Sequence, residues 1–355
     1  MPDNAVQVTA AHSLSGGMAN LLIANNFDPY VLKPWIGNDG NSYITRFDRN
    51  GKPYSQLVTN APATLRKDEW KQLDEALIRV AKPRLRVFGD LRAAGLEYTI
   101  PNGMSKTVLE YEDVSDITPA TISMDGIRRS QADRPVFDLK FLPLPIIHKD
   151  FQFTARQLAT SREKGRLDTT TAELAAMRVA EEIEKLTLGV SSSYSFGGGT
   201  VYGFTNFPNR ITGSLTNPAG AGWTPATAVQ EVLAMISASR AAYHYGPWVL
   251  YYSPAWDKYM NDDYSANKGD NTLAERIQRI EGINDVRVAD HLTGTRFVLV
   301  QQTANVARAV VGMEMTTVQW ESEGGMMLNF KVMAIMVPQL RTDQNNNTGI
   351  VDYSV

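Results

Sequence analysis

The chain of 355 residues contains no cysteine. Disulfide cross-links, thiolate catalysis and Cys-ligated zinc or iron–sulfur centres are therefore excluded. Histidine is also scarce, and no two of its four positions have the spacing of a metal-binding pair on a helix or strand: these positions are His12, His148, His244 and His291. The sequence predicts no metal site and no cofactor. It also predicts that His148, in an apolar stretch, is a packed or hydrogen-bonded histidine and not a catalytic base.

The chain lacks an excess of charge of either sign. It has 35 Lys and Arg against 38 Asp and Glu, a net charge of −3. A surface that grips nucleic acid is usually strongly basic, so only weak, non-specific contact with DNA is expected. No apolar run reaches the roughly 18 residues that span a bilayer, and Met1 to Ala11 lack the pattern of a signal peptide. We therefore expect no membrane partner and synthesis in the cytoplasm.

Motifs of known enzyme classes are missing as well. Gly197-Gly198-Gly199 is followed by Thr200-Val201 and not by the Lys-Ser/Thr of a phosphate-binding loop, so it indicates a flexible turn. No G-x-S-x-G nucleophile elbow occurs. The sequence predicts no catalytic residues and a protein that is not an enzyme. An enzyme of unrecognised type would need a convergent polar site.

Helical periodicity is clearest in two places. Over 65–82, Trp70, Leu73 and Leu77 share one face, and the interleaved charges of the region indicate a solvated or inter-subunit surface. Over 168–188, a Thr170/Glu173 capping box precedes an apolar stripe that steps by three and four residues. The opposite side of this second helix carries charges that predict a solvated face, among them Glu173, Arg178, Glu181, Glu184 and Lys185.

Strand-like alternation appears at Thr107 to Glu112 and at Phe137 to Phe141, separated by a long polar stretch that contains Arg128 and Arg129. A two-stranded ribbon is marginally stable alone in water. We therefore expect this ribbon to lie on another subunit, which indicates a protein that works as an assembly.

The remaining segments predict a mixed α and β chain. Residues 1–60 suit a flexible arm with a hairpin from 43–47 to 54–58, and Trp248 to Tyr252 predicts a buried strand. A Thr272/Glu275 capping box begins a helix to about Glu281. Three strands are expected near the end, over 307–311, 316–320 and 328–336, and Asn345 begins a polar tail.

Taken in order, these elements resemble the Hong Kong 97-type major capsid protein, a fold shared with the encapsulin nanocompartments. The resemblance covers roughly 65–341 and depends on the order and spacing of four stretches. They are the ribbon from Glu97-Tyr98-Thr99-Ile100-Pro101 to about Arg134, the stretch Phe141 to Phe151, the helix 169–189 with Tyr202-Gly203-Phe204-Thr205-Asn206, and Trp248 to Ala255 with Thr272 to Ile277.

The resemblance implies an α+β fold with a P-domain of spine helix and β-sheet, an A-domain of mixed sheet and helices, an N-terminal arm and an extended β-ribbon E-loop. The implied boundaries are 1–64 for the arm, 65–96 for P-domain helices, 97–136 for the E-loop, 137–222 for the P-domain with the spine helix at 169–189, 223–305 for the A-domain, and 306–355 for returning strands of the P- and A-domains and the C-terminal tail.

The resemblance further implies a subunit that self-assembles, as pentamers and hexamers, into the icosahedral shell around the packaged double-stranded DNA of a tailed bacteriophage. Its partners would be a scaffolding protein and a portal, with a decoration protein as a further option. Its location would be the virion capsid, and the host cytoplasm during assembly. An encapsulin-like compartment is the alternative, but the long arm and the loop region at 189–224 favour a phage capsid.

Two sets of residues follow as candidates for such a role. The expected inter-subunit contacts are Leu109, Tyr111, Arg128, Arg129, Lys106 and Trp70, and the expected inner-face carboxylates are Glu173, Glu181 and Glu184. Some family members join subunits through a Lys–Asn bond. For Lys106, an ordinary solvated lysine is the favoured interpretation.

Overall fold

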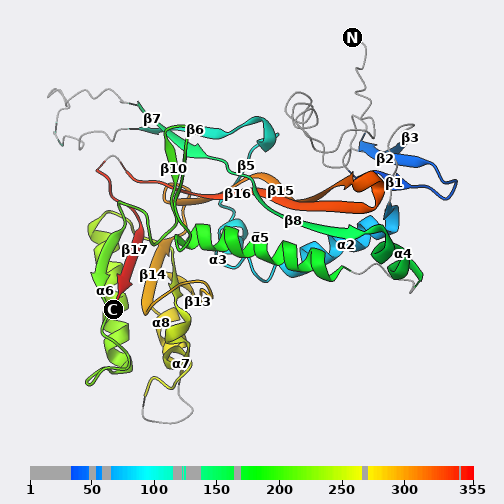
Figure 1. The fold of residues 1–355 in the computed structure, drawn as a ribbon. Coiled ribbons are helices and arrows are strands. Elements are labelled where there is room, and N and C mark those ends of the chain that lie inside the picture. The colour runs from blue at the N-terminus through cyan, green and yellow to red at the C-terminus, as the bar shows by residue number, and fades with distance from the viewer. Residues whose placement is uncertain are drawn as a thin grey trace.

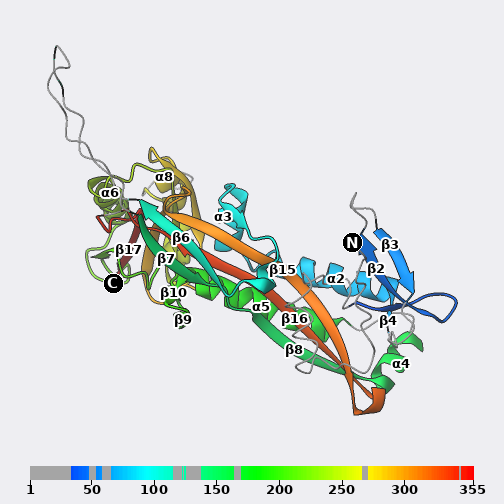
Figure 2. The ribbon, with the colours of Figure 1, turned by 90° about the horizontal axis from the view of Figure 1, so that it is seen from above.

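The computed structural model describes residues 33–47, 53–57, 65–114, 122, 124, 137–163, 169–265, 271–343 and 345–355. Its central feature is a long hairpin of β15 (Ala307–Ser322) and β16 (Met327–Leu340), which runs the length of the molecule (Figures 1 and 2). Strands β5 (Glu97–Thr99) and β8 (Ile147–Thr154) complete a four-stranded sheet in the order β5-β15-β16-β8. The two strands expected over 307–311 and 316–320 are one continuous strand. Its pairing with β16 continues across 312–315, where the register shifts on either side of Met313.

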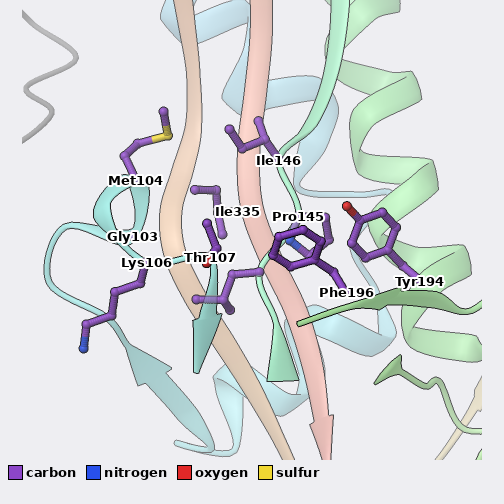
Figure 3. Close-up of a pocket in the computed structure, with 10 residues that line it drawn as sticks. Gly103, Met104, Lys106, Thr107, Pro145, Ile146, Tyr194, Phe196 and Ile335 are labelled. Atoms are coloured by element: carbon purple, nitrogen blue, oxygen red, sulfur yellow. The ribbon is translucent and has the colours of Figure 1, made fainter. Parts of the chain in front are cut away.

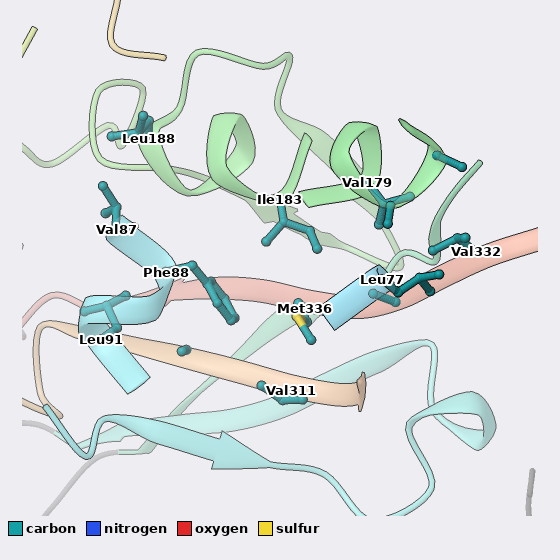
Figure 4. Packing of buried hydrophobic residues seen from close by; sticks show 14 of the residues in the cluster. Leu77, Val87, Phe88, Leu91, Val179, Ile183, Leu188, Val311, Val332 and Met336 are labelled. Carbon is teal, nitrogen blue, oxygen red and sulfur yellow. The ribbon is translucent and has the colours of Figure 1, made fainter. Parts of the chain in front are cut away.

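Three helices pack on one face of this sheet: α2 (Lys67–Ala81), α3 (Val87–Ala93) and α5 (Thr170–Leu188). Figure 4 shows Val179 and Ile183 of α5 directed toward the layer that contains Val332 and Met336 of β16. The predicted apolar stripe of α5 is buried, and its alanines let helix and sheet approach closely. The helix begins at Thr170, inside the expected range 168–188, and its N-cap is Thr169 and not the expected Thr170.

A second layer covers the other face of the sheet at one end. It contains the ribbon of β6 (Val108–Val114) and β7 (Phe137–Pro143) and the hairpin of β9 (Tyr194–Phe196) and β10 (Gly199–Val201). Along β16, Phe330 and Val332 face the helices, whereas Ile335 and Val337 face this second layer. Strand β16 is therefore buried on alternate residues at its start and continuously toward its end, where both faces are covered.

A five-stranded sheet with its own core stands at one end of the molecule (Figure 1). Its order is β11 (Ile211–Ser214), β17 (Ile350–Ser354), β14 (Arg296–Gln301), β12 (Trp248–Tyr252) and β13 (Ile283–Val288). Helices α6 (Pro225–Ala241), α7 (Asp257–Met260) and α8 (Leu273–Gln278) accompany it. The buried strand Trp248 to Tyr252 and the Thr272/Glu275 capping box are confirmed, although α8 ends before Glu281.

Two strands of this sheet lie outside the range 223–305, and one of them, β17, lies in the range 306–355 from which strands were expected to return to the P- and A-domains. Strand β11 precedes the range 223–305, and β17 follows the stretch expected to be a polar tail. The expectation of a polar tail was wrong beyond Thr348. Ile350 and Val351 are fully buried in β17, which pairs with β11 on one side and β14 on the other.

The N-terminal part contains a small sheet of β3 (Pro53–Leu57), β2 (Ser42–Phe47), β1 (Trp35–Ile36) and β4 (Leu65–Arg66), in that order. The predicted hairpin is present, but its second strand lies one residue earlier than expected, with Tyr43 opposite Leu57 and Phe47 opposite Pro53. The remaining elements are α4 (Ala155–Glu163) and the 3-10 turns η1 (Gly103–Ser105), η2 (Pro254–Trp256) and η3 (Glu323–Gly325). Among the described residues, no helix is long and apolar enough to cross a membrane.

A buried ion pair fixes the C-terminal strand in the five-stranded sheet. The Asp352 side chain is only 3% exposed, its Oδ2 accepts a hydrogen bond of 3.0 Å from Arg210 Nε, and its Oδ1 lies 3.4 Å from Arg296 Nε. Burial raises the pKa of this carboxyl, and the two guanidinium groups oppose that rise. Asp352 of β17 is thus bound both to Arg210, which directly precedes β11, and to Arg296 at the start of β14.

Replacing Asp352 with alanine should lower the free energy of unfolding by about 3 kcal/mol, because two partly buried arginines lose their counter-charge. Urea unfolding of the unassembled subunit measures this. Asp290→Ala is the matched control, since its side chain is 51% exposed and pairs with Arg86 at 3.3 Å; its cost should stay below about 1 kcal/mol. Equal losses for the two variants would contradict a structural role for Asp352.

Candidate interaction surface

Within the described ranges, no three His, Asp or Glu side chains lie close enough to hold a metal ion. His148 is exposed on β8, and its Nδ1 forms a hydrogen bond of 3.4 Å with the carbonyl oxygen of Ile146, so of the two predicted alternatives it is hydrogen-bonded and not packed. Gly197 and Gly198 form the two-residue turn between β9 and β10, and both have positive φ. This is a tight hairpin turn and not a phosphate cradle.

The ribbon is anchored at its base by apolar side chains. Leu109 of β6 and Leu142 of β7 are opposite each other and buried, 8% and 4% exposed. They pack against Val201 and Ile335. Gly199 allows the hairpin to press on the ribbon, since a Cβ there would lie 2.1 Å from the carbonyl oxygen of Phe141. The predicted ribbon is thus confirmed, but its base belongs to this subunit's own core.

Farther from the base, the ribbon is held to its own chain by the segment 341–342, where Arg341 Nη2 donates a hydrogen bond of 3.1 Å to the Glu112 carbonyl oxygen, but several of its side chains are exposed. Glu110 and Leu139 are exposed, Leu139 to 49%, and Glu112 is exposed as well. Tyr111 is half-buried beneath the guanidinium of Arg341, 5.5 Å from the ring centre. A paired strand that carries an exposed leucine is suited to contact with another chain.

An apolar groove of about 190 Å³ lies beside the ribbon base (Figure 3). It runs between η1, the Pro145 region and β9. Tyr194 and Phe196 are 45% and 51% exposed, and Ile146 is 42% exposed. Figure 3 shows the Phe196 ring beside Pro145, with Lys106 reaching away from the other lining side chains. Three large exposed apolar side chains around one groove form a surface that another protein segment can cover.

The candidate contact residues fall into three groups. Trp70 and Leu109 are buried within this subunit, Trp70 against Phe330 in an edge-on contact, so the prediction that they meet a neighbouring subunit is wrong. Tyr111 and Lys106 are at least partly accessible and lie near the groove or the ribbon. Arg128 and Arg129 lie outside the described residues.

The three carboxylates of α5 do not share the solvated face that the sequence indicated. Glu173 is partly exposed and pairs with Arg79 at 2.6 Å. Glu181 is 7% exposed and pairs with Arg178 at 2.8 Å. Glu184 is 2% exposed and accepts hydrogen bonds from the amides of Val87 and Phe88. The prediction of inner-face carboxylates is therefore corrected for Glu181 and Glu184, because α3 and its preceding turn cover that side of the helix.

Sequence reasoning missed Tyr194 and Phe196 as surface residues. The sequence predicted a loop region at 189–224, which contains both residues. The signal was present, however: Tyr194 and Phe196 alternate with Ser195 and directly precede a Gly-Gly pair, which is the pattern of a short hairpin.

Residues 60–353 match the model of a protein family described as a family of unknown function, DUF6260. The chain belongs to the DUF6260 family. One curated relative, the type 1 encapsulin shell protein EncA of Myxococcus xanthus, is 26% identical over 201 residues. That match covers 56% of this chain and 64% of the relative, so it spans slightly less than two thirds of EncA.

Solved structures show the fold of this DUF6260 member. A virus-like particle from Pyrococcus furiosus matches with a TM-score of 0.58 and 16% identity, over 80% of this chain and 98% of that chain. The capsid of Myoviridae phage XM1 matches with a TM-score of 0.55 and 8% identity, over 70% and 85%. The chain has the Hong Kong 97-type capsid fold, and the predicted α+β fold class is confirmed.

Proposed function

We propose that this protein is the major capsid protein of a tailed bacteriophage and assembles into an icosahedral shell around packaged double-stranded DNA. The observation that carries the shell-forming part of the proposal is the fold, which covers 98% of the chain of the virus-like particle subunit. The exposed ribbon and the apolar groove support it, because both present surface that a neighbouring chain can bury. No catalytic role is proposed.

In this proposal, the four-stranded sheet with α2, α3 and α5 is the P-domain, and the five-stranded sheet is the A-domain. The β6–β7 ribbon is the E-loop, and the small N-terminal sheet belongs to the arm. We include β11 and β17 in the A-domain because both pair within its sheet. Pentamers and hexamers would close the shell if each contact repeats at a defined angle.

Encapsulin-like compartments are the second candidate, and the relationship to EncA favours them. We prefer a phage capsid because of the arm at 1–64 and the insertion at 189–224, which contains the exposed Tyr194 and Phe196. A scaffolding protein, a portal and a decoration protein are proposed partners of the phage capsid. The net charge of −3 suits a shell in the virion that touches its DNA only weakly.

Expression of the full chain, followed by size-exclusion chromatography and negative-stain electron microscopy, tests the proposal. Closed shells or capsomer rings are expected, alone or with a scaffolding protein encoded beside the gene. Co-purified protein cargo inside the shells would favour the compartment. A stable monomer in every condition would overturn both shell-forming candidates.

The groove aromatics provide a sharper test of which surface assembles. The double variant Tyr194→Ser/Phe196→Ser should fold normally and lose at least tenfold in shell yield, because it removes two half-exposed rings from the contact surface. Tyr243→Ser/Tyr245→Ser is the matched control, since these tyrosines are 72% and 67% exposed on the loop between α6 and β12. An equal loss in the control would mean that the groove has no special part in assembly.

A further inference from the structure

The ribbon segment carries two large apolar side chains that its own chain leaves uncovered. Ile122 and Met124 lie between β6 and β7 in the sequence, and both are fully exposed. Neither side chain has a charged group or a hydroxyl that favours contact with water. Their exposure in the single subunit therefore leaves apolar surface that burial against another molecule would stabilise.

The groove beside the ribbon base is suited to an uncharged apolar segment. Tyr194 and Phe196 of β9 form one side, and Ile146 forms part of the other. None of the described residues that line the groove carries a carboxylate, and the one cation, Lys106, reaches away from the other side chains (Figure 3). An apolar segment can enter such a groove without the cost of burying a charge.

The spacing of side chains is the same on both surfaces. Tyr194 and Phe196 are two residues apart on β9, and within the described residues β9 pairs only with β10. An extended segment can therefore lie along its other edge. Side chains two residues apart in such a segment face the same side. Ile122 and Met124 have this spacing, so both can enter the groove together.

Ile122 and Met124 fit the groove better than the other exposed pairs of this spacing. Among the described residues, three such pairs have large exposed apolar or aromatic side chains: 122 with 124, 194 with 196, and 243 with 245. The second pair lines the groove itself. The third pair consists of two tyrosines, whose hydroxyls favour contact with water. Methionine, by contrast, adapts to irregular surfaces and packs well against aromatic rings.

We propose that Ile122 and Met124 of one copy of the chain occupy the groove at Tyr194 and Phe196 of a second copy. They do not occupy the groove of their own subunit, because there they would be buried and not fully exposed. The two surfaces differ, so the contact is head-to-tail, and each copy both inserts a segment and receives one. The inference rests on the proposed shell-forming function and names the occupant of the groove.

Engineered cysteines test the contact directly, because the natural chain has none that could form other disulfides. The test variant carries Met124→Cys and Thr107→Cys in one chain; Thr107 is exposed and lines the groove. After mild oxidation, a non-reducing gel should show a ladder of covalent dimers, trimers and larger species, because each copy is linked to two others. The control, Met124→Cys with Tyr245→Cys, should give no species beyond dimers.

A second measurement asks whether the two surfaces act together. Met124→Ala and Phe196→Ala should each raise the subunit concentration needed for shell formation by about tenfold. The double variant should also raise it by about tenfold, and not by about a hundredfold, because both changes remove the same contact. Ile78→Ala on α2, where the side chain is 58% exposed, is the control and should leave the required concentration unchanged.

The outcomes separate this inference from the proposed function. Shells that form without a ladder would overturn the inference and leave the shell-forming function standing. A ladder from protein that never closes into shells would support the contact and contradict the function. A disulfide within one chain, or neither ladder nor shells, would also overturn the inference. So would a hundredfold effect in the double variant, since the groove would then have a different occupant.

Discussion

Replacing Gly203 with alanine should prevent the chain from reaching its native fold. Gly203 lies in the turn Gly203-Phe204-Thr205-Asn206 that closes the end of α5. A Cβ on Gly203 would lie 2.1 Å from the amide nitrogen of Gly189 and 2.3 Å from the carbonyl oxygen of Leu186. Both atoms are backbone, so no side chain can rotate away to make room.

The clash would displace several hydrogen bonds at once. In this turn, the Gly203 amide donates to Asn206 Oδ1 at 2.7 Å, and the amides of Phe204 and Thr205 donate to the last carbonyls of α5 at 3.0 and 2.9 Å. Phe204 is fully buried against Tyr251. Loss of this arrangement combines strain, unpaired polar groups and a displaced core ring, which together exceed about 4 kcal/mol.

Soluble yield, circular dichroism and thermal unfolding measure the outcome. Gly203→Ala should give little soluble protein or a melting temperature lowered by more than about 10 °C. Gly89→Ala is the matched control: a Cβ at Gly89 meets nothing within 4 Å, and Gly89 lies inside α3. It should leave stability unchanged or raise it by about 1 kcal/mol. A Gly203→Ala protein that melts as the wild type does would disprove the tight turn.

Periodicity made much of this fold predictable. Local patterns in the sequence predicted four features that are present in the structure: the apolar stripe of α5, the apolar face of α2, the two ribbon strands and the fully buried β12. The similarity to the Hong Kong 97-type fold depended on the order of these elements, and the structural matches bear it out. Such features are predictable because each of them involves only one segment of the chain.

Features that depend on a distant partner were missed. Glu184 looks like part of a polar helix face, and only the arrival of α3, almost a hundred residues earlier in the chain, makes it a buried acceptor. Strands β11 and β17 are short and lie on either side of the segment that supplies the rest of their sheet. A short strand carries little periodic signal, and its membership of a sheet is decided by pairing over long sequence distances.

The candidate contact residues show the same limit. Leu109 alternates correctly for a ribbon strand, but alternation does not say whether the covering surface belongs to the same subunit or to a neighbour. The structure places it in the subunit's own core, next to Leu142. Exposed apolar side chains that gather around one groove, as Ile146, Tyr194 and Phe196 do, are the observation that points to a partner.

A subunit with a shortened ribbon should fold normally and fail to form shells. In this variant the two residues Asn-Gly replace residues 113–138 and form the turn between Glu112 and Leu139. These two residues lie opposite each other in the ribbon. Asn-Gly is the preferred two-residue turn between antiparallel strands. The ribbon base is kept, including buried Leu109 and Leu142 and the hydrogen bond of 2.9 Å from the Leu144 amide to the Thr107 carbonyl.

The subunit should keep its stability because the ribbon base stays in place, and because Ile122 and Met124, the two residues of the removed segment whose burial is described, are fully exposed. Its melting temperature should therefore stay within about 4 °C of the wild type, the shift that corresponds to roughly 1 kcal/mol. Shell yield, measured by size-exclusion chromatography and electron microscopy, should drop at least tenfold. Interfaces of this kind depend on a small number of contacts, and the removed part of the ribbon is the best candidate to reach a neighbour.

A second variant separates the sequence of the ribbon from its length. Here residues 113–138 are replaced by a flexible Gly/Ser segment of equal length, which keeps the reach of the chain and removes its pairing and side chains. If the ribbon acts by specific contact, this variant fails as the shortened one does; if it acts only as a tether, the Gly/Ser variant assembles. Closed shells from the shortened subunit would contradict a role for the ribbon in assembly. The groove at Tyr194 and Phe196 would then be the remaining candidate surface, because neither variant changes its lining residues.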